Sequence, residues 1–259
     1  MEEIYYKTMT ETEYLYGHQY VNGLNIQDRE YDPNSTYFGS YFTFVLVKNI
    51  FQFIDGGYYL REITLPIDCL CVADPNLDHI KSDKIILGAR YNLTDVLTFK
   101  MLLKKGADIH AGYDSALRWA AKNGHLEISK FLVENGADVC AYDNYALRVA
   151  FENGHTDIVK YLVDNGAEIT TSDNYALRFV LKYKNFGITK YLLKNNIATS
   201  DIDKRLAFLC VCRNGWTTLA HSLYDEGHRM IFKPGDLEYM LRNKFYRMVY
   251  FILDKEMFP

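Results

Sequence analysis

The chain of 259 residues has few cysteines and no apolar run that approaches the roughly 20 residues needed to span a bilayer. Its five cysteines form an odd set, which argues against a disulfide framework and fits a reducing compartment. Two Cys-x-Cys pairs, Cys69/Cys71 and Cys210/Cys212, are too closely spaced for the usual zinc motif. The acidic, polar start is unlike a secretory signal. We therefore expect a cytoplasmic protein without a metal site or a membrane span.

Motifs of catalysis are also missing. No Ser-His-Asp set, phosphate-cradling glycine loop or clustered carboxylate pair stands out, so we expect neither an enzyme nor a cofactor. The net charge of −4 gives no global reason to expect nucleic acid or an anionic membrane as a partner. The charge is uneven: residues 1–80 carry 4 Lys or Arg against 12 Asp or Glu, whereas residues 81–259 carry 25 against 21. This difference predicts a domain boundary near residue 80.

What the sequence does contain is a repeat with a period of thirty residues. Three short motifs recur at that spacing: ALR at 116–118, 146–148 and 176–178; NGH at 123–125 and 153–155; GAD or GAE at 106–108, 136–138 and 166–168. A fixed period in this range is the signature of a stacked repeat array. We predict a mostly α solenoid over residues 81–259 with about six units, near 84–110, 111–140, 141–170, 171–200, 201–231 and 232–256.

Each repeat reads as a pair of short helices. In the unit 141–170, Asn144 can cap a first helix at about 145–152, and Gly154 can end it with a positive φ. Thr156 can cap a second helix at about 157–164, whose apolar residues follow helical spacing. Helices of two or three turns cannot bury an apolar side alone, so we expect neighbouring units to pack against one another.

These recurring motifs resemble those of the ankyrin-repeat family. NGHLEISKFLVENGADV (Asn123–Val139) and NGHTDIVKYLVDNGAEI (Asn153–Ile169) match the family's second-helix pattern. The resemblance implies a non-catalytic protein-interaction scaffold that binds a host or viral protein on its concave face. Where the family reads TPLH, this chain reads SALR or YALR, and about three residues fewer separate GAD from ALR. We therefore expect shortened β-hairpin fingers.

Residues 1–80 have a different character and predict a small α+β module that caps the first repeat. Tyr41–Val47 and Tyr59–Pro66 read as strands, and 49–55 reads as a short helix between them. The stretch from His18 onward resembles the leader of ankyrin proteins from giant amoeba-infecting DNA viruses of the mimivirus type. A fainter resemblance, to the nicotinamide pocket of ADP-ribosyltransferases, implies an alternative in which His18 and Tyr41 bind NAD and Glu62 is the nominal candidate for the acid that assists transfer.

The expected partner surface consists of positions on the fingers and first helices that packing leaves free. Tyrosine and tryptophan recur there, and both are favoured as interface anchors. Some of these tyrosines could equally pack against the next finger. The predicted partner-binding residues are Tyr113, Asp114, Trp119, Lys122, Tyr142, Asp143, Tyr145, Glu152, Asp173, Tyr175, Lys182 and Tyr183.

Two further interpretations remain open. The arginine column Arg118, Arg148 and Arg178 could track phosphates, but we favour bonds to carbonyls of the shortened fingers or to the nearby Asp143 and Asp173. The C-terminal segment 232–259 could serve a ubiquitin-ligase adaptor, as the resemblance to some viral ankyrin proteins implies. It lacks the expected Leu-Pro box, so we interpret it as a terminal cap. We expect a monomer.

Overall fold

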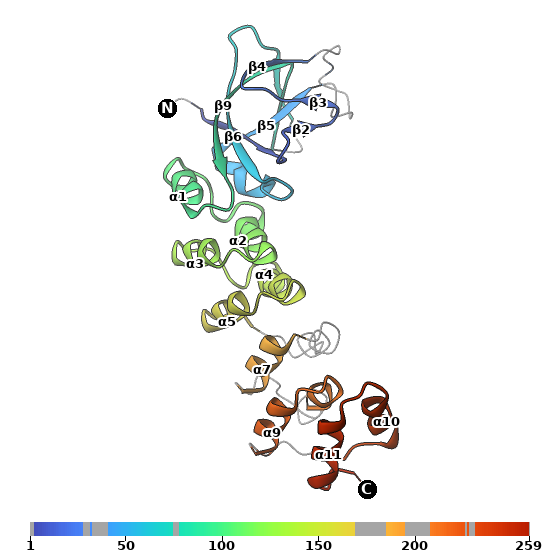
Figure 1. Ribbon diagram of the computed structural model, residues 1–259. Helices are drawn as coiled ribbons and strands as arrows, with labels where there is room; N and C mark the ends of the chain where they lie inside the picture. The colour runs from blue at the N-terminus through green and yellow to red at the C-terminus, as the bar shows by residue number, and fades with distance from the viewer. Residues whose placement is uncertain are drawn as a thin grey trace. The chain divides into compact units, whose positions relative to one another are not determined.

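The computed structural model describes residues 3–27, 32, 41–74, 78–168, 185–194, 208–225, 227 and 231–258. The chain divides into two compact units, Met1–Ala146 and Leu147–Pro259. The first unit holds a β-sheet and the first helices, and the described part of the second unit is helical (Figure 1). A largely helical chain with a strand-rich N-terminal region is what the sequence predicts. The division itself falls inside a helix of the repeats rather than near residue 80.

The N-terminal region is an antiparallel sheet of seven strands in the order β4-β9-β6-β1-β5-β8-β7, with a separate hairpin of β2 and β3. The predicted strands are confirmed as β5 and β6, and the predicted helix between them is a 3-10 helix, η1. The bounds are β1 Tyr5–Met9, β2 Tyr14–Leu15, β3 His18–Gln19, β4 Gly23–Ile26, β5 Phe42–Leu46, η1 Val47–Phe53, β6 Tyr59–Thr64, β7 Cys71–Ala73, β8 Ile80–Ser82 and β9 Lys84–Asn92.

Strand β9 extends the sheet well past the predicted boundary at residue 80. It pairs with β4 on one side and with β6 on the other, so it lies inside the sheet rather than in a connection to the repeats. The core on one face of the sheet comes from alternate residues of several strands. Its fully or nearly buried members are Met9, Tyr20, Phe42, Phe44, Ile63, Ile85 and Leu87.

The helices of the first unit follow the sheet directly: α1 Val96–Lys104, α2 Ala111–Asn123, α3 Leu126–Glu134 and the start of α4 Ala141–Glu152. Helix α2 packs against both η1 and α3, and α1 packs against α3. Gly112 lies where α2 meets η1. A Cβ at this position would approach the backbone of Gln52 to 3.3 Å. This close approach explains why glycine stands here, whereas tyrosine stands thirty residues later.

The second unit continues the pattern of short helices. Helix α5 (Thr156–Asp164) contacts α7 (Phe186–Lys194), and α9 (Thr217–Asp225) contacts α11 (Tyr246–Asp254), which packs on α10 (Pro234–Arg242). A buried cluster joins the last three helices and includes Phe208, Val211, Leu219, Leu223, Met240, Met248 and Ile252. Large parts of the predicted units 171–200 and 201–231 lie outside the described residues, so the count of six units stays a prediction.

The glycines that end the first helices adopt the backbone conformation that the repeats predict. Gly124 follows α2 with φ 78°, and Gly154 follows α4 with φ 76°. Gly215, after the helical residues 208–213, has φ 70° and lies against the ring of Phe245. A Cβ at Gly215 would stand 2.8 Å from that ring. Both the positive φ and the close contact require glycine at this position.

We expect Gly215→Ala to lower the free energy of unfolding of the second unit by about 1–3 kcal/mol, because it adds left-handed strain and overpacks the ring. Urea unfolding followed by Trp216 fluorescence, in a Trp119→Phe background, measures this. The matched control is Gly235→Ala, at the start of α10, where a Cβ would meet no atom within 4 Å. Equal stability of the two variants would contradict the assignment.

Candidate interaction surface

A left-handed turn of three residues replaces the expected β-hairpin finger in the two repeats 111–140 and 141–170. In the first, Gly112, Tyr113 and Asp114 have φ of 61°, 57° and 55°. The same geometry returns thirty residues later at 142–144, with φ of 53°, 57° and 54°. Consecutive left-handed residues cost roughly 1–2 kcal/mol each unless they are glycine or are stabilised by side chains, as asparagine and aspartate can be. The turn therefore needs specific contacts to persist.

Two side chains supply such contacts in the first turn. The guanidinium of Arg118 donates a hydrogen bond from Nη2 to the carbonyl oxygen of Gly112 at 2.6 Å. The Oδ1 atom of Asp114 accepts a hydrogen bond from the backbone N–H of Asp138 at 2.9 Å and lies 3.1 Å from Nδ1 of His110. The preferred interpretation of the arginine column, hydrogen bonding to a carbonyl of the shortened finger, is thus confirmed at Arg118.

Asp114 is only 5% exposed, so its place among the predicted partner-binding residues needs correction. Its carboxylate joins the turn to the Gly-Ala-Asp motif near the end of the same repeat, just before the next turn. Asn144, thirty residues later, is also buried. Sequence reasoning treated this position as free because a polar residue in a turn usually faces water. The recurrence of Asp or Asn at the same register was the available signal of a structural role.

Three predicted tyrosines gather beside these turns and form, with Arg118, a set that we call the Tyr–Arg cluster (Tyr113, Arg118, Tyr142 and Tyr145). The ring of Tyr142 lies 5.9 Å from that of Tyr113 and 5.6 Å from that of Tyr145. The Cζ atom of Arg118 stands 5.1 Å from the Tyr142 ring centre and 5.5 Å from that of Tyr145. Tyr113 is 72% exposed and Tyr142 is 58% exposed. The cluster therefore offers aromatic surface and hydroxyl groups to solvent, with a half-buried cation among the rings.

Trp119 is a second correction to the predicted surface, because it is only 6% exposed. Its indole stacks on Phe99 of α1 with ring centres 5.8 Å apart, and it contacts the ring of His125 at 5.0 Å. Trp119 thus holds α1, α2 and the start of α3 together. It belongs to the apolar side of α2, one position after the half-buried Arg118.

The remaining predicted residues have different surroundings. Lys122 forms an ion pair with Asp55 at 3.2 Å, which links α2 to the loop after η1. Asp143 and Glu152 are exposed on α4. Asp173, Tyr175, Lys182 and Tyr183 lie outside the described residues. Sequence reasoning favoured a structural role for Arg118 and did not include it in the protein-binding surface. Its position over two aromatic rings makes it part of the exposed cluster as well.

The three residues of the alternative NAD pocket lie in different surroundings. The ring of His18 contacts Tyr20 and Phe42, and the Tyr41 ring faces the amine of Lys81 at 4.7 Å. Glu62 pairs with Lys105 at 3.1 Å beside α1.

Glu62 and the hydroxyl of Tyr6 both accept hydrogen bonds from Lys105, and this raises the pKa of the Lys105 amine despite desolvation by burial. Glu62 is therefore engaged in attaching the sheet to α1. Among the residues that the structure describes, no three His, Cys, Asp or Glu side chains gather as a metal site requires. No helix within the described ranges combines the length and apolar character needed to cross a membrane.

Pairs of short helices whose turns and sequence motifs recur every thirty residues define a tandem helical-repeat protein. The family described as "Ankyrin repeats (3 copies)" matches residues 85–173. The chain is 35% identical over 135 residues to uncharacterized protein R869 of Acanthamoeba polyphaga mimivirus and covers 94% of it. The chain belongs to the ankyrin-repeat family, in the form found in mimivirus, as its sequence predicts.

Two other mimivirus proteins illustrate the relationship. Over 133 residues, 49% of this chain, it is 33% identical to putative ankyrin repeat protein R868 and spans 65% of that protein. It is 36% identical over 118 residues to putative ankyrin repeat protein R229, a match that covers 43% of this chain and 38% of the relative. The chain thus spans less than two thirds of these two relatives. Ankyrin repeats act in general as protein-interaction scaffolds and are generally non-catalytic.

We expect Asp114→Ala to lower the free energy of unfolding of the first unit by about 1–3 kcal/mol, because the N–H of Asp138 loses its acceptor. Asp114→Asn keeps an oxygen at the same place, as Asn144 does in the next repeat, and should lose clearly less. Urea unfolding followed by Trp119 fluorescence in a Trp216→Phe background compares the variants. An alanine variant as stable as the wild type would show that other contacts hold the turn.

Proposed function

We propose that this protein is a non-enzymatic scaffold that binds a protein of the amoeba host or of the virus through the Tyr–Arg cluster. The observation that carries the proposal is the exposure of Tyr113 and Tyr142 beside Arg118, on turns whose backbone is fixed by hydrogen bonds. Tyr175 and Tyr183, which the sequence predicts as further anchors, lie outside the described residues.

The chemistry of the cluster favours a protein over other partners. Tyrosine and arginine are enriched among the residues that contribute most to binding between proteins. Tyrosine gives a large contact area at a small loss of rotamer entropy, because it has only two side-chain torsions. A nucleic-acid surface would need several cations that contact phosphates. Here the one guanidinium is engaged by the Gly112 carbonyl and by two rings.

The fixed geometry of the cluster adds to this argument. The Arg118 guanidinium is hydrogen-bonded to the carbonyl of Gly112 in the turn and lies against the rings of Tyr142 and Tyr145. Its side chain is therefore already ordered before a partner binds. Binding surfaces that are already ordered lose less conformational entropy when a partner docks. We propose that the left-handed turns replaced the longer fingers of the family in this role, by presenting tyrosine rings on a short, stiff backbone.

A pair of triple variants tests the proposal. The first replaces Tyr113, Tyr142 and Tyr145 with alanine and removes the aromatic surface of the cluster. The second is a matched control that replaces Tyr239, Tyr246 and Tyr250, which are exposed on α10 and α11. Tagged full-length chains capture partners from infected amoebae, and the captured protein is then purified and its affinity measured.

We expect the first variant to bind the partner at least about tenfold more weakly, since a single anchor contributes about 1–2 kcal/mol or more. The control variant should bind as the wild type does, and both should unfold at the same temperature as the wild type. Full binding by the first variant would refute the role of the cluster. Loss of binding by the control alone would move the interface to the C-terminal helices.

The C-terminal helices also carry the second candidate function, a ubiquitin-ligase adaptor. On α11, Tyr250 is 74% exposed and Leu253 is 50% exposed, so this helix also offers aromatic and apolar surface to a partner. The adaptor function requires that ligase subunits co-purify with the wild type and disappear with the Tyr239, Tyr246 and Tyr250 variant. If the captured proteins include no ligase subunit, the adaptor function is excluded and only the scaffold function remains.

A further inference from the structure

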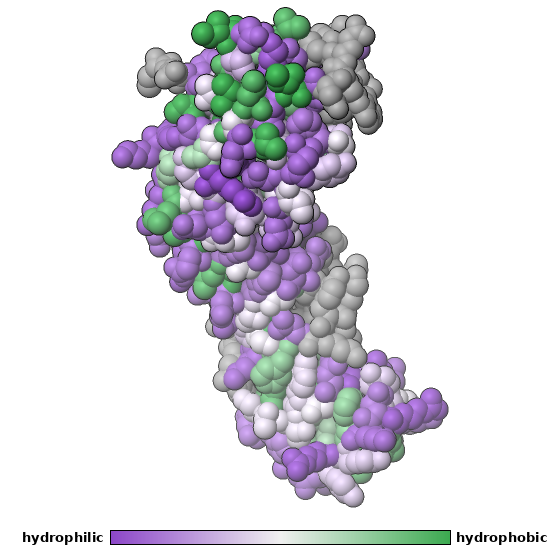
Figure 2. All heavy atoms as spheres, turned by 45° about the horizontal axis from the view of Figure 1, so that its top comes forward, coloured by the Kyte–Doolittle hydropathy of each residue, from purple (hydrophilic) through white to green (hydrophobic). Residues whose placement is uncertain are grey.

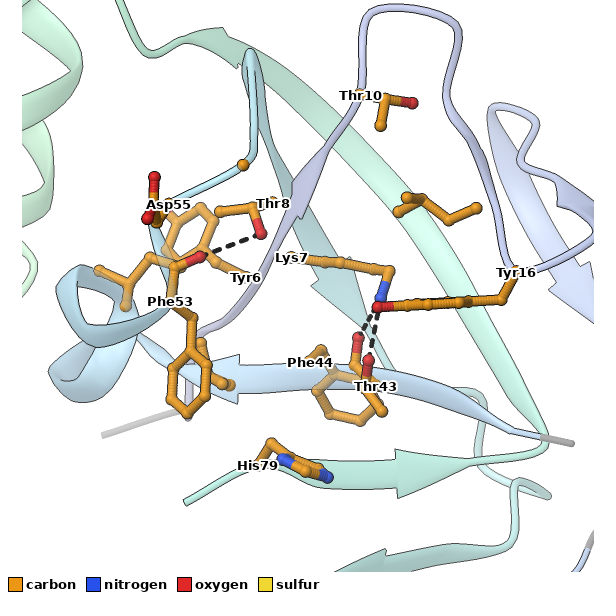
Figure 3. A pocket seen from close by; sticks show the side chains of 14 residues that line it. Tyr6, Lys7, Thr8, Thr10, Tyr16, Thr43, Phe44, Phe53, Asp55 and His79 are labelled. Atoms are coloured by element: carbon orange, nitrogen blue, oxygen red, sulfur yellow. Dashed lines mark hydrogen bonds between the residues drawn. The ribbon is translucent and has the colours of Figure 1, made fainter. Parts of the chain in front are cut away.

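Strands β1 and β5 separate soon after they begin to pair. Their register covers only Tyr5 with Leu46 and Tyr6 with Val45, after which β5 pairs with β8 alone. The side chain of Lys7 bridges the opening: its Nζ atom donates to the carbonyl oxygen of Thr43 at 2.7 Å and to Oγ1 of Thr43 at 3.0 Å. Figure 3 shows these two bonds across the gap between the strands. A pocket of about 470 Å³ lies at this opening.

Lys7 is an unusual residue for its place in the sheet. By strand alternation it shares a face of β1 with Tyr5 and Met9, which belong to the apolar core. Lys7 is only 7% exposed. A buried charge is normally compensated by an opposite charge, because its removal from water is costly. No ion pair among the described residues includes Lys7, so its two uncharged oxygen partners are its only polar contacts there.

Burial lowers the pKa of the Lys7 amine to about 8, and no carboxylate opposes this shift. The amine therefore remains mainly protonated at pH 7, inside a pocket of the size that small ligands occupy. The charged groups that face it from neighbouring elements are few. Asp55 lies at the far side of the pocket and pairs with Lys122, and His79 of the β7–β8 region pairs with Asp74. Tyr20 places its ring 5.6 Å from the amine.

The rest of the lining has two kinds of surface. Hydroxyl groups of Thr10 and Tyr16 lie on the side of Lys7 (Figure 3). Apolar side chains form much of the remainder, namely Leu15, Phe44, Val45, Ile50 and Phe53. One cation beside an apolar wall suits a ligand with one negative charge and a hydrocarbon body. A polyphosphate would need several cations, and the described lining offers no second lysine or arginine.

We propose that the pocket between β1 and β5 binds a small amphiphilic carboxylic acid, whose carboxylate pairs with the amine of Lys7 and whose hydrocarbon part lies against Phe44 and Phe53. This site belongs to the sheet and is independent of the interaction surface on the repeats. The carboxylate supplies the opposite charge that the buried amine lacks. An ammonium group has three N–H donors, and two of them bond to Thr43. The carboxylate would accept a hydrogen bond from the third.

Phenylacetate is the probe, and 2-phenylethanol is an uncharged analogue of the same size. Methyl signals of Leu15, Val45 and Ile50 in the full chain are followed by NMR, with Leu219 of the second unit as the internal control. We expect phenylacetate to shift the pocket methyl signals with a dissociation constant on the order of 1 mM, as befits a ligand of this size. The alcohol should bind at least about tenfold more weakly.

The pH dependence identifies the amine as the partner. Phenylacetate is ionised throughout the range from pH 7 to pH 9. The amine loses its proton as the pH rises through about 8, so the affinity should fall about tenfold between pH 7 and pH 9. The same fall should persist in His79→Asn and Asp55→Asn variants, because neither group pairs with the carboxylate. An affinity that does not change over this range overturns the proposal.

Lys7→Met keeps an unbranched side chain only one atom shorter and removes the charge. We expect this variant to bind phenylacetate no better than the alcohol. Should the variant unfold, the pH dependence in the wild type decides the question alone. Equal binding of phenylacetate by folded Lys7→Met and wild type overturns the proposal, as does the absence of any shift in the pocket methyl signals at concentrations well above 1 mM.

Discussion

The hydrogen bond from the Asp138 amide to the Asp114 carboxylate is the interaction on which the arrangement of the described repeats depends. It joins the left-handed turn at 112–114 to the Gly-Ala-Asp motif near the end of the same unit, twenty-four residues later along the chain and just before the next left-handed turn. Helices of nine to thirteen residues have too little apolar surface to fold alone, so each pair needs a fixed neighbour. The buried carboxylate of Asp114 fixes the end of its unit, and so the point at which the next unit begins, because it accepts a hydrogen bond from the Asp138 amide while it also contacts Nδ1 of His110.

The same turn explains why structure and binding can occupy the same few residues. Asp114 points inward and is buried, whereas Tyr113 beside it points outward and is 72% exposed. Arg118 serves both sides, since its guanidinium bonds the Gly112 carbonyl and also lies near two exposed or half-buried rings. A left-handed turn achieves this division in three residues. The longer hairpin of the family is not needed to place aromatic rings at the surface.

The recurring motifs allowed much of the helical region to be predicted, because each motif determines local backbone structure, such as the end of a helix. Gly124 and Gly154 end helices with positive φ, and the helix that begins after Asn144 ends at Glu152, as the spacing indicates. The handedness of the turn was beyond sequence reasoning, since a deletion of three residues is compatible with several tight turns. Trp119 was misplaced for a related reason: on a short helix, one position decides between the exposed and the buried side.

The sheet was harder to predict than the repeats because its contacts are distant in sequence. Strand β9 pairs with β4, about sixty residues earlier, and nothing local in KIILGARYN identifies that partner.

The position of Lys7 could not be inferred either, because its burial results from the separation of β1 and β5, a property of strand geometry rather than of composition.

Hydrophobic side chains gather on the strand-rich end in the view of Figure 2, while the helical part of the first unit is mostly hydrophilic there.

These differences bear on how the two candidate sites can be separated. The Tyr–Arg cluster depends on a turn that local hydrogen bonds hold, so its tyrosines can be removed without disturbing the backbone that carries them. The Lys7 pocket depends on the divergence of two strands, and its amine is part of what satisfies the open edge of β5. A change at the tyrosines of the cluster therefore acts on recognition alone, whereas a change at Lys7 acts on charge and on strand geometry together. For that reason the protonation state of an unaltered chain is the cleaner probe of the pocket, and side-chain removal is the cleaner probe of the cluster.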